Sequence, residues 1–198
     1  MENKEQRRFP EWERYLSIHE AGHALLAYLW GSRSIEIGIA DENRTIVFSG
    51  DNEHNDCKAA CLYDLYHDDG LTPDPKAMLS VMIAGAAAES VYTGLSIDHL
   101  MTKTAKSDSE KIAKSLELIQ KRACGRPDHS KWIYLRSLSL CKSIINIYWR
   151  DIEALADLVE QKRMTPHPEI INFFESRESL KEARIYQLID TIDRGEAA

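Results

Sequence analysis

The segment SIHEAGHALLAYLWG, residues 17–31, decides the fold and the chemistry expected of this chain. Within it and just before it, apolar residues recur at steps of three and four, which predicts an amphipathic helix. Pro10 suits the first helical position, and Gly31 suits the end of the helix. His19 and His23 are four residues apart, so their side chains lie on one face of this helix, one turn apart.

His19, Glu20 and His23 form the H-E-x-x-H pattern of zinc hydrolases. Two imidazoles on one helical face can bind the same zinc ion, which lowers the pKa of a bound water to near neutrality. The Glu20 carboxylate can take the proton from that water and deliver it to a leaving amine. A shuffled chain of this composition contains the pattern only roughly 2% of the time. We therefore favour a zinc site over a helix that happens to carry two histidines.

A catalytic zinc needs a third protein ligand and an open fourth position. The residues after His23 read ALLAYLW, which excludes the metzincin pattern, because that pattern continues with a glycine and a third histidine. Two acids remain as candidates: Glu89 in GAAAESV and Asp108 in AKSDSEKIAKS. Each of the two acids also has an explanation that involves no metal. Asp108 falls in the first turn of a predicted helix, where the helix dipole favours an acid. Glu89 could pair with a backbone group or an arginine. Chemistry alone does not separate them.

The rest of the chain predicts a mainly α (α+β) fold, with a small β-hairpin or sheet beside a helical bundle. Alternating residues around a DEN turn predict the hairpin at residues 34–49. We expect one domain over residues 1–198, with the active helix, the hairpin and a small-residue helix in about 10–94 and a helical part in about 105–194. Further helices are expected at residues 58–66, 74–92 (ended by Gly94), 107–123 (opened by a capping box at Ser107 and Glu110) and 129–191 (broken at MTPHPE).

Composition excludes several classes of partner. The formal net charge is -7, from 25 Lys and Arg against 32 Asp and Glu, which argues against a nucleic-acid or anionic-membrane surface. No run approaches the roughly 20 apolar residues that span a bilayer, and the N-terminus does not have the pattern of a secretory signal. Four scattered cysteines are typical of reduced thiols. We expect a cytoplasmic protein without a membrane span.

Several segments together resemble the protease domain of the FtsH family, the ATP-dependent membrane zinc proteases. IHEAGHALLAYLW resembles that family's HEAGH helix, and MLSVMIAGAAAESVYTG resembles its apolar run ending in Ala-Ala-Glu. KSDSEKIAKSLELI resembles the Ser-Asn-Asp segment that opens a helix, and IINIYWRDIEALADLVEQKRMTPHPEI is a looser match to the late helices. The segments occur in the same order, so the resemblance covers about residues 15–174.

The resemblance implies zinc bound by His19, His23 and an aspartate, here Asp108, with Glu20 as general base. It implies that Glu89 is a nearby supporting carboxylate rather than the third ligand. The family's TGASND is here TAKSDS, and the stretch before it is longer than usual, so Asp98 is an outside alternative. The resemblance also implies a largely helical zincin-type protease domain with a small sheet. An edge strand of such a sheet can bind an extended peptide, and residues 35–48 are the candidate.

The sequence departs from the family in having no Walker-type loop, no ATPase module and no membrane anchor. We therefore expect a stand-alone, ATP-independent zinc metallopeptidase that cleaves peptides or unfolded protein segments, or that depends on a partner protein or ATPase. The alternative is a non-catalytic, FtsH-like module that binds a peptide or a regulatory partner. The oligomeric state is left open.

Overall fold

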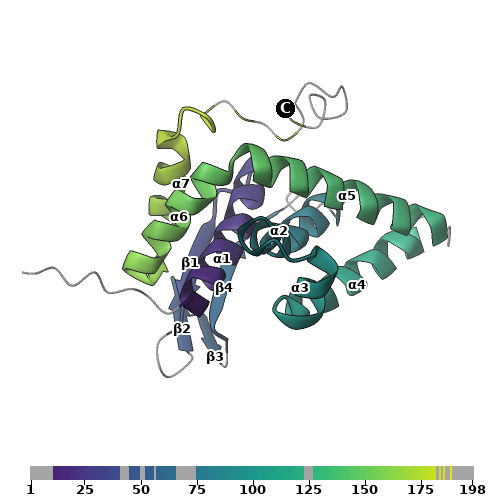
Figure 1. Ribbon diagram of the computed structural model, residues 1–198, viewed down its shortest axis with the longest axis horizontal. Coiled ribbons are helices and arrows are strands. Elements are labelled where there is room, and N and C mark those ends of the chain that lie inside the picture. The colour runs from purple at the N-terminus through teal and green to yellow at the C-terminus, as the bar shows by residue number, and fades with distance from the viewer. Residues whose placement is uncertain are drawn as a thin grey trace, which may run out of the picture.

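A computed structural model describes residues 11–40, 45–49, 52–55, 57–65, 75–122, 127–181, 183, 185 and 188. The expected mainly helical fold with a small sheet is confirmed (Figure 1). The elements in chain order are α1 (Glu11–Leu29), β1 (Ile35–Ile39), β2 (Thr45–Phe48), β3 (Asn52–Asn55), β4 (Ala59–Tyr63), α2 (Pro75–Thr93), α3 (Ile97–Lys103), α4 (Lys106–Arg122), α5 (Pro127–Ile147), α6 (Trp149–Lys162), β5 (Met164–Thr165) and α7 (His167–Ser176).

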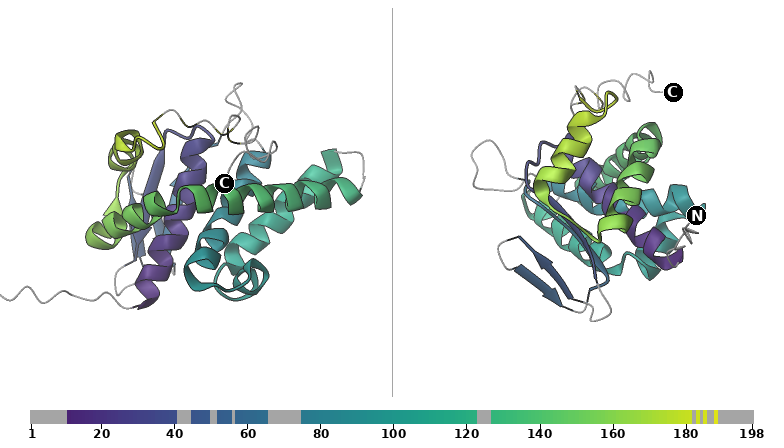
Figure 2. Two further views of the ribbon diagram at one scale, coloured as in Figure 1. Left: turned by 45° about the horizontal axis from the view of Figure 1, so that its top comes forward. Right: turned by 90° about the vertical axis from the view of Figure 1, so that its left-hand side faces the viewer.

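Helix α1 is the centre of the fold, packed against α2, α6, β1 and β4 (Figures 1 and 2). It approaches α2 closely at Gly22, where an added Cβ would lie 2.7 Å from the carbonyl oxygen of Ala84. The predicted end at Gly31 is confirmed, because this residue has φ 94° and its amide donates to the Tyr28 carbonyl. The Ser32 amide donates to the Ala27 carbonyl, which completes a Schellman motif. The predicted start at Pro10 lies outside the described residues.

The predicted hairpin between residues 34 and 49 is wrong, although both of its strands exist. Strand β1 lies between β4 and β5 and pairs antiparallel with both, whereas β2 pairs with β3 in a separate two-stranded ribbon. The ribbon packs on the face of β1, because a Cβ on Gly38 would lie 2.3 Å from the Ile46 side chain. Strand β1 is therefore buried on both faces. Among the described strands it is paired along one edge by β4 and at Ile37 and Gly38 of the other edge by β5.

The short helix predicted at residues 58–66 is also wrong, because Ala59–Tyr63 forms strand β4. In the register with β1, Cys61 lies opposite Ile37 and Tyr63 lies opposite Ile35. Pairing with a strand that is distant in the sequence outweighs the local helical preference of this segment. Cys61 and Tyr63 lie on the face of the sheet that packs against the main core, which contains α1.

The segment between α2 and α4 contains a helix that the sequence analysis missed. Helix α2 ends before Gly94, as predicted, with φ 73° at this glycine. Helix α3 then begins after Ser96, whose side chain accepts a hydrogen bond from the His99 amide. Helix α4 begins at Lys106, so Ser107 lies inside its first turn and the predicted capping box is not formed.

The C-terminal part is mainly helical as far as Ser176, but it is interrupted at two places, whereas the sequence predicted one. The helical pattern is interrupted at Tyr148, between α5 and α6, and again by the short strand β5. Strand β5 pairs with β1, so the MTPHPE segment completes the three-stranded sheet. Helix α7 ends at Ser176 and is followed by a turn at residues 178–181, but Ile185 and Leu188 are again helical. Most residues beyond 181 are outside the described part, so the helix predicted up to residue 191 stays a prediction there.

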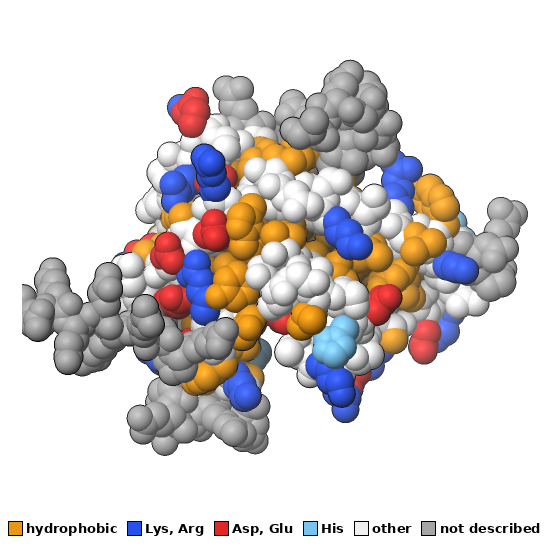
Figure 3. Space-filling model, viewed as in Figure 1, with side chains coloured by type: hydrophobic (Ala, Val, Ile, Leu, Met, Phe, Trp, Pro, Cys, Tyr) orange, Lys and Arg blue, Asp and Glu red, His pale blue; other side chains and the backbone are white. Residues whose placement is uncertain are grey.

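The surface shown in Figure 3 has interspersed acidic and basic side chains, with apolar side chains between them. Trp132 and Leu135 on α5 are among the apolar residues that remain more than half exposed. In the described ranges no single helix is long and apolar enough to cross a membrane; α2 and α3 together reach the required length and hydropathy, but they are bent by 114°.

Candidate metal centre

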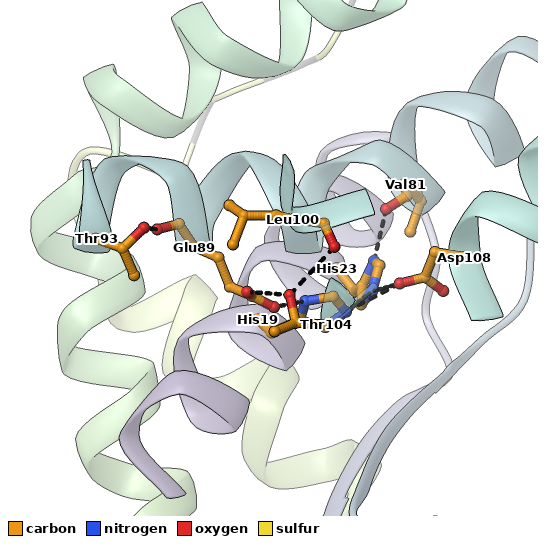
Figure 4. A network of polar contacts seen from close by, with 8 residues as sticks. All are labelled: His19, His23, Val81, Glu89, Thr93, Leu100, Thr104 and Asp108. Carbon is orange, nitrogen blue, oxygen red and sulfur yellow. Dashed lines mark hydrogen bonds and ion pairs between the residues drawn. The ribbon is translucent and has the colours of Figure 1, made fainter. Parts of the chain in front are cut away.

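Two histidines from α1, one carboxylate from α2 and one from α4 meet in the interior of the protein (Figure 4). His19, His23, Glu89 and Asp108 are all buried. The Nε2 atoms of His19 and His23 are 2.9 Å apart. Asp108 Oδ2 lies 3.0 Å from Nε2 of His19 and 3.3 Å from Nε2 of His23. The sequence therefore named the residues that converge, although they come from distant parts of the chain.

The outer nitrogens of the two imidazoles fix where their protons lie. His23 Nδ1 is 2.6 Å from the carbonyl oxygen of Val81, which can only accept a hydrogen bond. His19 Nδ1 is 2.6 Å from Glu89 Oε1, and an ionised carboxylate is likewise only an acceptor. Both Nδ1 atoms must therefore carry hydrogen. In the neutral rings, both Nε2 atoms then present lone pairs to each other and to Asp108.

Three electron-rich atoms that face one another need a cation between them. His19, His23 and Asp108 are the group of described residues whose ligand atoms all lie within 4.8 Å of one another. Bonds of about 2.1 Å to a tetrahedral zinc place neighbouring ligand atoms about 3.4 Å apart, close to the 2.9–3.3 Å separations seen here. The residues thus fit a metal ion by donor type and by spacing.

Without a metal, a proton takes the place of the cation. Burial lowers the pKa of His19, but hydrogen bonds with Asp108 and Glu89 outweigh it and raise this pKa to about 10. Burial also raises the pKa of Asp108, but the charge and hydrogen bonds of His23 and His19 hold it well below its usual value. The metal-free site therefore favours a protonated His19 beside an ionised Asp108.

A glycine on α2 makes room for the two imidazoles. A Cβ on Gly85 would lie 2.5 Å from Nε2 of His19 and 2.6 Å from Nε2 of His23. No side chain larger than hydrogen fits there without moving the rings. The AGAAAE segment, expected to allow close approach of another backbone, thus brings the backbone of α2 next to the nitrogen atoms that would bind the metal.

Glu89 and Asp98, the other two predicted acids, do not join this group. Glu89 lies on the opposite side of His19, at Nδ1, and its second oxygen accepts a hydrogen bond of 2.7 Å from Thr104 Oγ1 (Figure 4). Asp98 is exposed on α3. Sequence reasoning missed Val81, because a backbone carbonyl has no sequence signal, and Thr104, because α3 was not predicted.

Glu20 lies beside the metal centre without being part of it. It is 6% exposed, and burial raises the pKa of its carboxyl group, while the charges of His19 and His23 lower it. None of the described residues forms a hydrogen bond with its carboxylate oxygens, and the charged groups that act on it are His19, His23, Asp108 and Lys111. Burial raises the pKa values of Cys61 and Tyr63 on β4, and the nearby charges of Glu20 and Asp108 raise them further, so β4 lies alongside the site.

Lys111 lies beside this cluster of acids. Its Nζ lies 3.5 Å from Asp108 Oδ1, the oxygen that does not face the histidines, and its side chain is 58% exposed. Its charge lowers the pKa of both Glu20 and Cys61. The ammonium group of an exposed lysine therefore lies next to the buried carboxylate of Asp108.

Comparison of the sequence with protein-family models finds no match, and the search of curated proteins finds none either.

Proposed function

We propose that this chain is a zinc metallopeptidase with an FtsH-like site, which cleaves peptides or unfolded protein segments. The observation that carries this proposal is the convergence of the Nε2 atoms of His19 and His23 and a carboxylate oxygen of Asp108 beside Gly85. The H-E-x-x-H helix and the resemblance of the motifs to the FtsH family support it. A zinc ion there would be bound by His19, His23 and Asp108.

The bound ion would supply Lewis-acid chemistry, lowering the pKa of water and polarising a carbonyl oxygen. The buried carboxylate of Glu20 supplies the base. It accepts a proton from the attacking water as the water oxygen bonds to the peptide carbonyl carbon, and it then donates this proton to the amine nitrogen as the C–N bond breaks. Burial raises the pKa of Glu20 towards neutrality, which suits a group that must both accept and release a proton.

A peptide substrate would pair with β4 rather than with the strand that the sequence suggested. Among the described strands, β4 has β1 on one side only, whereas β1 is paired on both sides. An extended peptide can add to such an edge through its main-chain hydrogen bonds. Cys61 and Tyr63 on β4 are influenced by the charges of Glu20 and Asp108, so this edge lies next to the proposed base.

The test compares wild type with Glu20→Gln for both zinc content and cleavage of an unfolded protein such as casein. Glutamine keeps the shape of the side chain but cannot accept the proton. We expect both proteins to hold about one zinc per chain and kcat/KM of the variant to fall by about 100- to 10,000-fold. Full activity in Glu20→Gln would overturn the role of the base.

A zinc-loaded wild type that binds unfolded peptides without cleaving them would instead support the binding-module alternative. Peptide affinity measured by fluorescence anisotropy, alongside turnover on the same peptides, separates these outcomes. Wild-type protein that binds no zinc after incubation with an excess would overturn the metal site itself.

A further inference from the structure

The corner between α3 and α4 acts on both sides of the His19 imidazole, directly at Nε2 through Asp108 and indirectly at Nδ1 through Glu89 of α2. Thr104, the C-cap residue of α3, donates a hydrogen bond of 2.7 Å to Glu89 Oε2. The other oxygen of Glu89 accepts from His19 Nδ1 at 2.6 Å. Four residues after Thr104, in the first turn of α4, Asp108 faces His19 Nε2 at 3.0 Å. One short piece of chain therefore contacts the Nε2 side of the His19 ring through Asp108 and supports the Glu89 carboxylate on the Nδ1 side (Figure 4).

The hydroxyl of Thr104 has two acceptors within reach but only one proton. The Glu89 carboxylate is 2.7 Å away and the Leu100 carbonyl is 3.3 Å away. The charged and closer acceptor forms the stronger bond. Thr104 is exposed but Glu89 is only 4% exposed, so the loss of this donor weakens a bond to a largely buried carboxylate. With Thr104 in place, both carboxylate oxygens are fixed and the plane of the carboxylate is set.

A fixed carboxylate orients the imidazole that it holds. A partner on the far nitrogen of a metal-binding histidine sets the ring orientation and raises the basicity of the ligand nitrogen, and its loss typically costs 10- to 100-fold in metal affinity. We propose that Thr104 is a positioning residue, acting through Glu89 on His19, that couples the α3–α4 corner to the metal centre. This inference rests on the metal site of the proposed function and does not require catalysis.

The coupling must act in both directions, because linkage between two equilibria is reciprocal. If the hydrogen bond of Thr104 favours metal binding, the bound metal also favours the folded α3–α4 corner. Helix α3 has only seven residues, and Ile97, Leu100 and Met101 are the residues that it buries. Its local opening should therefore respond measurably to a ligand at His19.

The experiment compares wild type, T104V and T104S, with T102V as the matched control. Valine removes the hydroxyl at nearly constant size, and serine keeps it. Thr102 is an exposed residue of the same helix whose hydroxyl donates to the His99 carbonyl and not to Glu89. Zinc affinity is measured by competition with a chromophoric chelator, and amide hydrogen exchange of residues 97–105 is measured with and without zinc.

We expect T104V to bind zinc about 10- to 100-fold more weakly, and T104S and T102V to bind it as wild type does. Zinc should slow exchange at the α3–α4 corner in wild type, T104S and T102V, and much less in T104V at equal zinc occupancy. Circular dichroism checks that all four chains are folded. Equal zinc affinity and equal protection in wild type and T104V would overturn the role of Thr104 alone. Wild type that binds no zinc would overturn it together with the proposed metal site.

Discussion

The histidine half of the metal centre is formed by close helix packing, whereas the carboxylate half is formed by hydrogen bonds and an ion pair at a corner of the chain. In the first half, α2 has no room for a Cβ at Gly85 beside His19 and His23. In the second half, Asp108 lies in the first turn of α4, beside the half-exposed Lys111. Changes to the histidine half should damage helix packing and the site together, while changes to the carboxylate half should act through charge and hydrogen bonds rather than through packing.

The largest effect is expected from Gly85→Ala, in the histidine half. The new methyl group would lie 2.5–2.6 Å from atoms of both imidazoles, so the rings must move away from their present positions. We expect the free energy of unfolding to fall by about 1–3 kcal/mol and zinc binding to be lost. Chemical denaturation and elemental analysis measure the two effects on the same preparation.

Ala86→Gly provides the control for Gly85→Ala. Ala86 is a neighbouring buried residue of α2, and glycine there destabilises the helix by about 1 kcal/mol without adding an atom near the histidines. It should therefore lose stability but keep its zinc. If Gly85→Ala binds zinc as tightly as wild type does, the close packing of α2 is not what shapes the site.

In the carboxylate half, the contrast between Asp108→Asn and Glu89→Gln tests which acid binds the metal. Asparagine at 108 removes the charge that faces both Nε2 atoms, and we expect zinc affinity to fall by more than about 100-fold. Glu89→Gln keeps a hydrogen-bond acceptor for His19, so we expect a loss of at most about 10- to 100-fold. Competition with a chelator measures both. The reverse order would make Glu89 the ligand.

The histidine half could be predicted from the sequence because its signals are local. The H-E-x-x-H pattern, the apolar steps and Gly31 all lie within one helix, and the small residues of α2 predicted its close approach. Chemistry alone left Glu89 and Asp108 as equal candidates for the third ligand. The position of Asp108 on α4 depends on the preceding helix α3, a short helix whose cap at Ser96 was not recognised in the sequence.

The sheet was predicted less well because its pairing is decided far along the chain. Strand β1 pairs with residues 59–63 and 164–165, not with the next strand in the sequence. The alternation of Ile35 to Ile39 indicated a strand, but Glu36 and Gly38 do not face solvent as the alternation suggested, because the β2–β3 ribbon packs on that face. Local pattern identifies a strand, but its partners depend on tertiary contacts.

A smaller effect, on the pH dependence of stability, connects the two halves. In the metal-free protein burial lowers the pKa of His19, but Asp108 and Glu89 raise it overall from 6.5 to about 10. The folded state then binds this proton more tightly than the unfolded state does. The resulting stabilisation is complete below pH 6.5 and is lost as the pH rises from 6.5 to about 10.

We therefore expect the Tm measured with a chelator present to fall across this range of pH. Excess zinc should oppose the fall, because the metal binds the deprotonated imidazole. Asp108→Asn removes the first of the hydrogen bonds that raise the pKa, so its decline should be shallower and end at a lower pH. A metal-free Tm that does not change between pH 6.5 and 10 would contradict the proposed coupling of His19 to both carboxylates.

The smallest effect is expected from Lys111→Met, at the outer edge of the carboxylate half. The ion pair with Asp108 is 3.5 Å long and the lysine side chain is 58% exposed, so we expect stability to change by at most about 0.5 kcal/mol. Lys111 lowers the pKa of Glu20, and its loss should therefore raise that pKa. A base with a higher pKa becomes ionised only at higher pH, so the acid limb of the kcat/KM profile should move upward.

The expected shift of the acid limb is less than about one pH unit, because salt screens an exposed ammonium group. Lys114→Met, at another exposed lysine of α4, should leave the limb unchanged. A downward shift would mean that the limb does not report Glu20. An unchanged limb at low ionic strength would mean that Lys111 acts only on Asp108, and the carboxylate half would then influence metal binding without influencing the base.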